Sequence, residues 1–254
     1  LCYQLPALLL PHLTLVVSPL LALMQDQLAF LQRHGIPAAS IDSAQGRDEA
    51  SSVMARAKSG ELKILMISVE RLKNERFRHF LQQVPISLLV VDEAHCISEW
   101  GHNFRPDYLK LPDYQRQFNI PQVLLLTATA TPAVIVDMQT KFAIAEADVV
   151  TTGFYRANLN LWVEPVTGAA KRQRLVQWMG ERQGQPSIVY VTLQKTAEHI
   201  AQHLNQHGVS ASAYHAGLPH DQRESIQRQF MGGQLNCIVA TIAFGMGIDK
   251  PDVR

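Results

Sequence analysis

The sequence predicts an α/β protein with two domains of similar design, each built on a parallel sheet that helices cover on both faces. Two patterns lead to this fold class. Short apolar runs rich in β-branched residues, typical of buried parallel strands, alternate with segments whose apolar residues recur at helical spacing. A third observation divides the chain, because the alternation lapses into a polar stretch around residues 151–160 and then resumes. We therefore predict one domain over residues 1–155 and another over residues 156–254.

The first half of the chain contains five predicted strands joined by predicted helices. The strands cover residues 13–17, 38–41, 63–67, 88–91 and 123–126. The helices cover residues 1–10, 20–34 and 47–58. Another helix begins at Thr131 and Pro132, where a hydroxyl cap precedes proline at the first helical position. Gly35 suits the position just past the end of the second helix.

The second half repeats the alternation with further strands and helices. The helices cover residues 170–182, 194–207 and 219–231, and the strands cover residues 187–191, 210–214 and 235–241. Glycine follows two of these helices, at Gly208 and at Gly232. Because a helix is already under way at Leu1 and another strand should begin near Pro251, we expect the sequence to be a fragment of a longer protein.

Composition places the chain among ordinary globular proteins, since 47% of its 254 residues are hydrophobic and 18% are charged. The net charge of +1 gives no global basic field that would indicate nucleic acid, and it does not exclude a local basic groove. Cys2, Cys96 and Cys237 form no C-x-x-C pair, so we expect reduced thiols in a cytoplasmic protein. The apolar stretch 2–10 is too short to span a bilayer, so the sequence predicts no membrane segment.

Two adjacent carboxylates, Asp92 and Glu93, follow the apolar strand predicted at residues 88–91. This is the edge of a parallel sheet at which α/β proteins bind their ligands. Side chains alternate along a strand, so the two carboxylates can point the same way only where the strand has ended. We expect one carboxylate to reach a metal ion and the other a water molecule, as in phosphoryl transfer. The alternative is an ordinary polar turn after a buried strand.

Polar segments recur at the ends of the predicted strands along the whole chain. They are Ser18-Pro19-Leu20, Ser68-Val69-Glu70-Arg71-Leu72, Asp92-Glu93-Ala94-His95, Thr127-Ala128-Thr129-Ala130, Ile188–Glu198, Tyr214-His215-Ala216-Gly217 and Ala240–Asp249. In this order they resemble the motifs from Ia to V of the superfamily 2 helicases, and more closely those of the RecQ family of DNA helicases. The resemblance starts at Leu1–Ala7, which is similar to the sequence directly behind the phosphate-binding loop of that family.

The most specific part of this resemblance is the run over residues 95–106, which is similar to the aromatic-rich loop of RecQ proteins. Trp100, His102 and Phe104 offer planar faces on which unpaired bases stack, worth roughly 1–3 kcal/mol per base. Arg105 can bind phosphate with two parallel hydrogen bonds or stack on a base. Because the loop starts directly after the carboxylates, contact with a base could reposition them. The alternative is that the aromatic rings only pack beneath the loop.

The resemblance implies two tandem RecA-like domains of the P-loop NTPase helicase core, both truncated, with ATP and Mg²⁺ bound between them. Asp92 would coordinate Mg²⁺ through water, because this ion dehydrates reluctantly, and Glu93 would polarise the attacking water. His95, Thr127 and Thr129 would link hydrolysis to domain movement.

The resemblance also implies contacts to nucleotide and DNA elsewhere in the chain. Gly245, Gly247 and Asp249 would meet the nucleotide at the domain interface, since glycine allows close approach of the backbone. The candidate contacts to the DNA backbone are Ser18, Ser68, Arg71, Thr192 and Thr241. Each of these polar residues also has a simpler interpretation as a cap, a turn or a surface group.

Two parts of the family pattern do not occur in this sequence. It contains no G-x-x-x-x-G-K-[ST] loop, which the family would place immediately before Leu1, and no arginine-finger segment, which would follow Arg254. Zinc-binding and winged-helix modules, common in RecQ proteins, are not represented either. We therefore expect the parent protein to hydrolyse ATP and the isolated chain not to do so measurably.

We expect the parent protein to be an ATP-dependent DNA helicase that moves 3′ to 5′ on single-stranded DNA and unwinds partly duplex DNA. Its place would be DNA repair or recombination at the nucleoid of a bacterial-type cytoplasm. The alternatives are a duplex translocase, an RNA helicase and a non-catalytic nucleic-acid scaffold. The aromatic-rich loop counts against the first two, and intact Asp92 and Glu93 count against the third. A metalloprotease is disfavoured, because His95 lacks an H-E-x-x-H partner.

Overall fold

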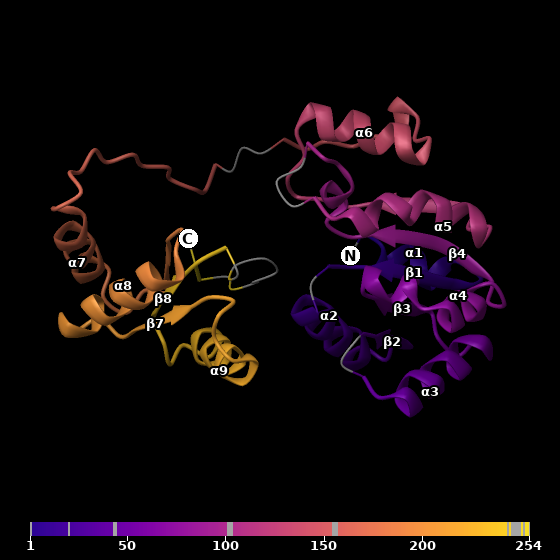
Figure 1. The fold of residues 1–254 in the computed structure, drawn as a ribbon, viewed down its shortest axis with the longest axis horizontal. Coiled ribbons are helices and arrows are strands. Elements are labelled where there is room, and N and C mark those ends of the chain that lie inside the picture. Colours follow the sequence, from indigo (N-terminus) through magenta and orange to yellow (C-terminus); the bar gives the residue numbers. More distant parts are fainter. Residues whose placement is uncertain are drawn as a thin grey trace. The chain divides into compact units, whose positions relative to one another are not determined.

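The chain divides into two compact units, residues 1–152 and residues 153–254. The computed structural model describes residues 2–19, 21–42, 45–100, 104–153, 157–242, 244, 250, 252 and 253, with only the backbone at residues 21, 22 and 220. Figure 1 draws the first unit from indigo to pink and the second from orange to yellow. The boundary that the sequence predicts, between residues 155 and 156, lies outside the described residues.

The first unit contains a five-stranded parallel sheet in the order β2-β3-β1-β4-β5. The strands are β1 (Leu13–Val17), β2 (Ala38–Ile41), β3 (Ile64–Ile67), β4 (Ile86–Val91) and β5 (Gln122–Leu125). The first four are buried along their whole length, which explains why they are mostly apolar in the sequence, with Thr14, Ser40 and Ser87 as the polar residues. Strand β5 lies at an edge of this sheet and is partly exposed.

Helices cover both faces of this sheet, as the sequence predicts. They are α1 (Gln4–Leu9), α2 (Leu21–Arg33), α3 (Arg47–Lys58), α4 (Glu75–Leu81), α5 (Leu111–Gln117) and α6 (Pro132–Phe142). Alternate side chains of the strands enter two separate cores. Leu15 and Leu89 pack with α3, α4, α5 and α6, whereas Val16 and Val90 pack with α1 and α2.

The second unit repeats this arrangement on a smaller scale. Its described strands are β6 (Ser187–Tyr190), β7 (Ala211–Tyr214) and β8 (Cys237–Ala240), which pair in parallel in the order β6-β8-β7. The helices are α7 (Lys171–Glu181), α8 (Gln194–Gln206) and α9 (His220–Met231). Central strand β8 sends Ile238 toward α9 and Val239 toward α7 and α8, so this sheet is also covered on both faces.

The structure contains two helices that the sequence analysis did not predict, α4 and α5, and adds short 3-10 turns at residues 69–73, 94–97, 106–110 and 146–148. Both missed helices have seven residues, fewer than the two turns over which helical spacing becomes visible. Helix α4 has a clear start signal, since Asn74 Oδ1 accepts a hydrogen bond from the Phe77 amide at 3.0 Å.

Other predicted boundaries are confirmed or shift by a few residues. The Thr131 cap is confirmed, because its hydroxyl accepts a hydrogen bond from the Val134 amide. The first helix begins at Gln4, three residues later than predicted. Among the described residues, no helix has the length and apolarity required to cross a bilayer.

The two units have separate hydrophobic cores, so damage to one core should leave the other sheet protected. We expect Phe230→Ala to destabilise the second unit by about 3–5 kcal/mol, because this ring is fully buried beside Phe244. Hydrogen exchange should then speed up in β6, β7 and β8 and stay unchanged in β1 to β5. Phe80→Ala is the reciprocal control, since this ring is buried in the first unit. Faster exchange in both sheets from either substitution would contradict separate cores.

Candidate functional site

The candidate site lies where the strands of the first sheet end together. Val17 at the end of β1 pairs with Ile67 of β3 and Val91 of β4, and Val91 pairs with Leu125 of β5. The polar segments after these four strands therefore leave the sheet along the same edge. Backbone hydrogen bonds continue this alignment past the strands, because the Asp92 amide donates to the Val17 carbonyl at 2.9 Å.

Both carboxylate oxygens of Asp92 accept hydrogen bonds. The Ser18 hydroxyl donates to Oδ2 at 2.9 Å, and the Glu93 amide donates to Oδ1 at 3.1 Å. Burial raises the pKa of Asp92 above its usual range, against the opposing effect of these two hydrogen bonds. A carboxylate that is removed from water and has no described cation beside it fits a site for a divalent cation. Asp92 is thus the residue of this edge that would hold Mg²⁺.

Ser18 has a different role from the one that the sequence suggested. We expected it to contact the DNA backbone, but its side chain is buried and its hydroxyl donates to Asp92. A buried hydroxyl engaged in this way is not available to a phosphate on the surface. The structure therefore makes Ser18 a residue that orients Asp92.

Glu93 adopts a left-handed backbone conformation, with φ 49° and ψ 46°. This conformation is uncommon for a residue other than glycine and ends the strand direction at once. Asp92 and Glu93 are consequently released from the alternation that a strand would impose. Glu93 Oε2 lies 3.3 Å from Nδ1 of His95, so the second carboxylate faces the next residue of the motif.

His95 connects this motif with the segment after β5. It is 1% exposed, and its Nδ1 lies 2.9 Å from the Thr127 hydroxyl. The Thr129 amide donates to the same hydroxyl at 3.2 Å, and the Ala94 amide donates to the carbonyl of Leu126. The structure therefore brings together Glu93, His95, Thr127 and Thr129 as one continuous set of contacts.

The aromatic-rich loop is closed at its base by a backbone hydrogen bond. The Arg105 amide donates to the Cys96 carbonyl at 2.9 Å, which joins the two ends of the loop directly beside the carboxylates. Trp100 is 78% exposed, so it does not pack beneath the loop as the alternative interpretation supposed. Phe104 and Arg105 are partly buried, and His102 lies outside the described residues.

Tyr108 packs beneath the base of this loop and was not singled out in the sequence. Its side chain is fully buried, and its hydroxyl lies 3.5 Å from the main-chain oxygen of Asp92. Nearby, Lys73 forms a 2.8 Å ion pair with Asp107, which joins the end of the loop to the segment after β3. Burial raises the pKa of Cys96 to about 11, in keeping with a protonated thiol. Asp107 and Tyr108 stand directly after the loop in the sequence, and no local pattern distinguishes them.

The other predicted contacts are spread over both units. Ser68 is buried after β3, and Arg71 is partly buried in the turn that follows. Thr192 is exposed and Thr241 is buried in the second unit; they follow β6 and β8, neighbouring strands whose ends align. Gly245, Gly247 and Asp249 lie outside the described residues. Within the described part of the chain, no group of three or more His, Cys, Asp or Glu side chains is placed to hold a metal ion by itself.

Comparisons with known proteins agree with this geometry. The family model "DEAD/DEAH box helicase" matches residues 1–138, and "Helicase conserved C-terminal domain" matches residues 170–254. The chain is 40% identical over 254 residues to the protein named ATP-dependent DNA helicase RecQ in Bacillus subtilis, and 40% identical to the protein of that name in Pasteurella multocida. All of this chain is covered in both cases, but it spans only 43% and 40% of those proteins.

Solved structures support the fold. Saccharomyces cerevisiae Dbp5 bound to RNA and ADP BeF3 has a TM-score of 0.71 at 20% identity, over 95% of this chain and 61% of that one. Mycobacterium smegmatis helicase Lhr bound to single-stranded DNA and AMP-PNP has a TM-score of 0.63 at 18% identity, over 95% of this chain and 35% of that one. These similarities show tandem RecA-like domains, in agreement with the predicted fold class.

The buried carboxylate of Asp92 should make stability depend on pH. Its raised pKa means that the folded state binds the carboxyl proton more tightly than the unfolded chain does. Stability therefore falls as pH rises from the unfolded pKa, about 3.9, through the higher folded value, and then levels off. We expect Asp92→Asn to lose this pH dependence, so that the variant gains Tm relative to the unmodified chain between about pH 3 and about pH 7.

Thermal denaturation of both proteins at the two pH values measures this effect. Asp26→Asn makes the same chemical change at an exposed position of α2 and serves as the matched control. A Tm difference between Asp92→Asn and the unmodified chain that is the same at both pH values would contradict the raised pKa.

Proposed function

We propose that this chain, which belongs to the DEAD/DEAH box helicases, is the motor core of an ATP-dependent DNA helicase of the RecQ type, since it is 40% identical to two proteins named ATP-dependent DNA helicase RecQ. The motor would couple ATP hydrolysis to 3′-to-5′ movement on single-stranded DNA and thereby unwind partly duplex DNA in repair or recombination. The observation that carries this proposal is the aromatic loop, which begins beside Asp92 and Glu93, is closed at its base and exposes Trp100. The proposed location is the bacterial-type cytoplasm, at the nucleoid.

Asp92 and Glu93 are the residues of this chain that would take part directly in ATP hydrolysis. Asp92, oriented by Ser18, would hold Mg²⁺ through water, and the bound ion would neutralise charge that develops on the phosphates. Glu93 would orient the attacking water by accepting a hydrogen bond from it. The Glu93 carboxylate contacts His95, and the left-handed backbone of Glu93 directs its side chain away from the alternation of the strand.

Coupling would pass through the contacts between His95 and Thr127. A change at Glu93 when the γ-phosphate leaves would alter the position of His95, and the Thr127–Thr129 segment would move with it. Gly245, Gly247 and Asp249 of the second domain would meet the nucleotide across the domain interface. This arrangement would let hydrolysis change the relation between the domains and so move the DNA.

The DNA contacts divide into stacking and phosphate binding. Trp100, His102 and Phe104 would stack on unpaired bases. Arg105 would bind a phosphate of the same DNA strand or stack on one of its bases. Ser68, Arg71, Thr192 and Thr241 would contact the backbone without reading sequence. Stacking suits single-stranded DNA and disfavours a translocase that remains on duplex. An RNA helicase stays a second candidate, and a non-catalytic scaffold a third, because both would also bind a single strand.

The loop should transmit DNA binding to the ATPase site. In the full-length protein, we expect single-stranded DNA to stimulate ATP hydrolysis strongly and Trp100→Ala to abolish most of this stimulation, because the exposed indole is the stacking face. Steady-state hydrolysis with and without DNA measures the effect, and the DNA-free rate should stay unchanged. Trp162→Ala, which removes an exposed indole of the second unit, serves as the control. Stimulation that survives Trp100→Ala would remove the loop from the coupling, and a full-length protein without hydrolysis would favour the scaffold.

The chain of 254 residues alone should not hydrolyse ATP measurably, because its sequence holds no G-x-x-x-x-G-K-[ST] loop to cradle the phosphates. The measurement is phosphate release from the purified chain with Mg²⁺ and single-stranded DNA. The Glu93→Gln variant shows whether any signal comes from a contaminant. Hydrolysis by the chain that disappears in Glu93→Gln would overturn this expectation.

A further inference from the structure

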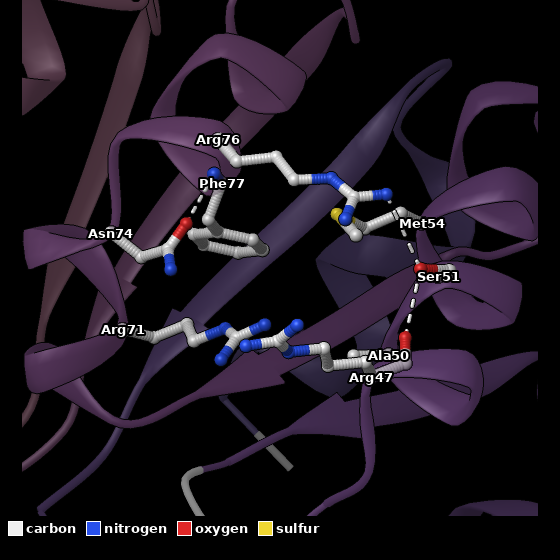
Figure 2. A pocket seen from close by; sticks show the side chains of 8 residues that line it. All are labelled: Arg47, Ala50, Ser51, Met54, Arg71, Asn74, Arg76 and Phe77. Carbon is white, nitrogen blue, oxygen red and sulfur yellow. Dashed lines mark hydrogen bonds between the residues drawn. The ribbon is translucent and has the colours of Figure 1, made fainter.

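The aromatic-rich loop is attached to the framework at both of its ends. After its far end, Asp107 forms a 2.8 Å ion pair with Lys73, in the segment that follows β3. The same segment lines a pocket of about 290 Å³ with α3, and Figure 2 shows the guanidinium groups of Arg47 and Arg71 facing each other across it. At its near end the loop is attached to α6, and this second attachment involves Ser98.

Helix α6 packs against the turn with which the loop begins. Val134 and Met138, one helical turn apart on α6, are buried in the same core as the apolar residues of the turn at 94–97. Asp137 directly precedes Met138, and its side chain is partly buried, with 22% exposed. One edge of the packed face of α6 therefore carries a carboxylate.

Ser98 joins the backbone of the loop to this carboxylate. Its side chain is fully buried, and its Oγ accepts a hydrogen bond from the Trp100 amide at 3.3 Å. A buried hydroxyl also needs an acceptor for its own proton, and the Ser98 hydroxyl donates to the Asp137 carboxylate. Burial opposes ionisation of Asp137, but hydrogen bonds from Lys141 and from Ser98 hold the pKa of its carboxyl below its usual range.

Lys141 makes Asp137 a stronger acceptor. Its Nζ lies 2.7 Å from Oδ1 of Asp137, one helical turn away. The ion pair is partly exposed, so it adds little to the stability of α6 by itself. It keeps the carboxylate charged, and a hydrogen bond to a charged acceptor is about twice as strong as one between neutral groups. Lys141, Asp137, Ser98 and the Trp100 amide therefore form one continuous set of contacts from α6 to the loop.

The same helix is connected to the candidate coupling segment at its other end. Thr131 caps α6 and stands two residues after Thr129 in the sequence. The Thr127 hydroxyl in turn contacts His95. A helix moves as a unit, because its backbone hydrogen bonds keep it rigid. Through Asp137, α6 thus gives the loop a second connection to the carboxylate site, in addition to the chain that runs from Asp92 into the loop.

We infer that Asp137 is a positioning residue, which holds the start of the aromatic-rich loop through Ser98 and joins it along α6 to the segment Thr127–Thr129. Asp137 acts on DNA only through the loop, because it sets the position from which Trp100 meets a base. This inference rests on the proposed function for the response of the loop to single-stranded DNA.

The first test is hydrogen exchange of the Trp100 amide, read by NMR on the purified chain. We expect Asp137→Ala and Ser98→Ala each to speed up this exchange roughly threefold to tenfold, the range for loss of one hydrogen bond. The double variant should exchange no faster than Ser98→Ala, because both substitutions remove the same contact. Asp137→Asn keeps an oxygen that accepts from Ser98, so its effect should be smaller than that of Asp137→Ala.

Lys141→Ala is the matched control, because it removes the ion pair within α6 and leaves the contact between Asp137 and Ser98. Exchange of the Trp100 amide should then stay close to that of the unmodified chain. An effect of Lys141→Ala equal to that of Asp137→Ala would trace the change to the stability of α6 and overturn the inference. Unchanged exchange in Asp137→Ala would also overturn it and would leave the proposed motor intact.

The second test is the concentration of single-stranded DNA that gives half-maximal stimulation of ATP hydrolysis in the full-length protein. We expect Asp137→Ala to raise this concentration roughly threefold to tenfold, Asp137→Asn to raise it less and Lys141→Ala to leave it unchanged. A general structural defect would instead lower the rates with and without DNA together. A half-maximal concentration that Asp137→Ala does not change would overturn the inference.

The two tests separate this inference from the proposed function. A full-length protein whose hydrolysis does not respond to DNA would overturn the proposed function and the link from Asp137 to DNA. The exchange rates of the Trp100 amide would still decide whether Asp137 holds the loop, because they depend on neither ATP nor DNA.

Discussion

The parallel register of the first sheet is the constraint on which the candidate site depends. Val17 lies beside Ile67 and Val91, so the residues that follow these strands meet at one edge. Ser18 and Asp92 are 74 residues apart in sequence, and His95 and Thr127 are 32 apart, yet short side chains join both pairs. A slip of one residue in any of these strands would turn its apolar side chains away from their core, so the two cores keep the site in place.

Two charged groups of the first unit share one energetic feature. Asp92 and the Nε of Arg71 are removed from water, and among the described residues neither has a partner of opposite charge beside it. Such groups lower the stability of the folded chain, and the buried strands around them offset this cost.

The sequence was sufficient to predict where the strands and long helices lie along the chain. Four strands of the first sheet are buried on both faces and are therefore mostly apolar in the sequence. The family resemblance grouped His95 with Thr127 and Thr129, and the structure adds the contact between His95 and Thr127, which follow neighbouring strands. The sequence was insufficient for α4 and α5, whose length hides their periodicity. The burial of Ser18 and the convergence of Arg47 with Arg71 depend on side-chain directions in three dimensions, which no local pattern records.

The hydrogen bond between Arg105 and Cys96 has a consequence for how the loop can vary in sequence and length. It fixes both ends of the loop to the framework, so the residues between them can change in number or kind while the base keeps its position. Closing a somewhat longer loop costs little additional entropy. Substitutions or insertions at the tip can therefore change which groups the loop exposes while the segment that carries Asp92 and Glu93 keeps its position.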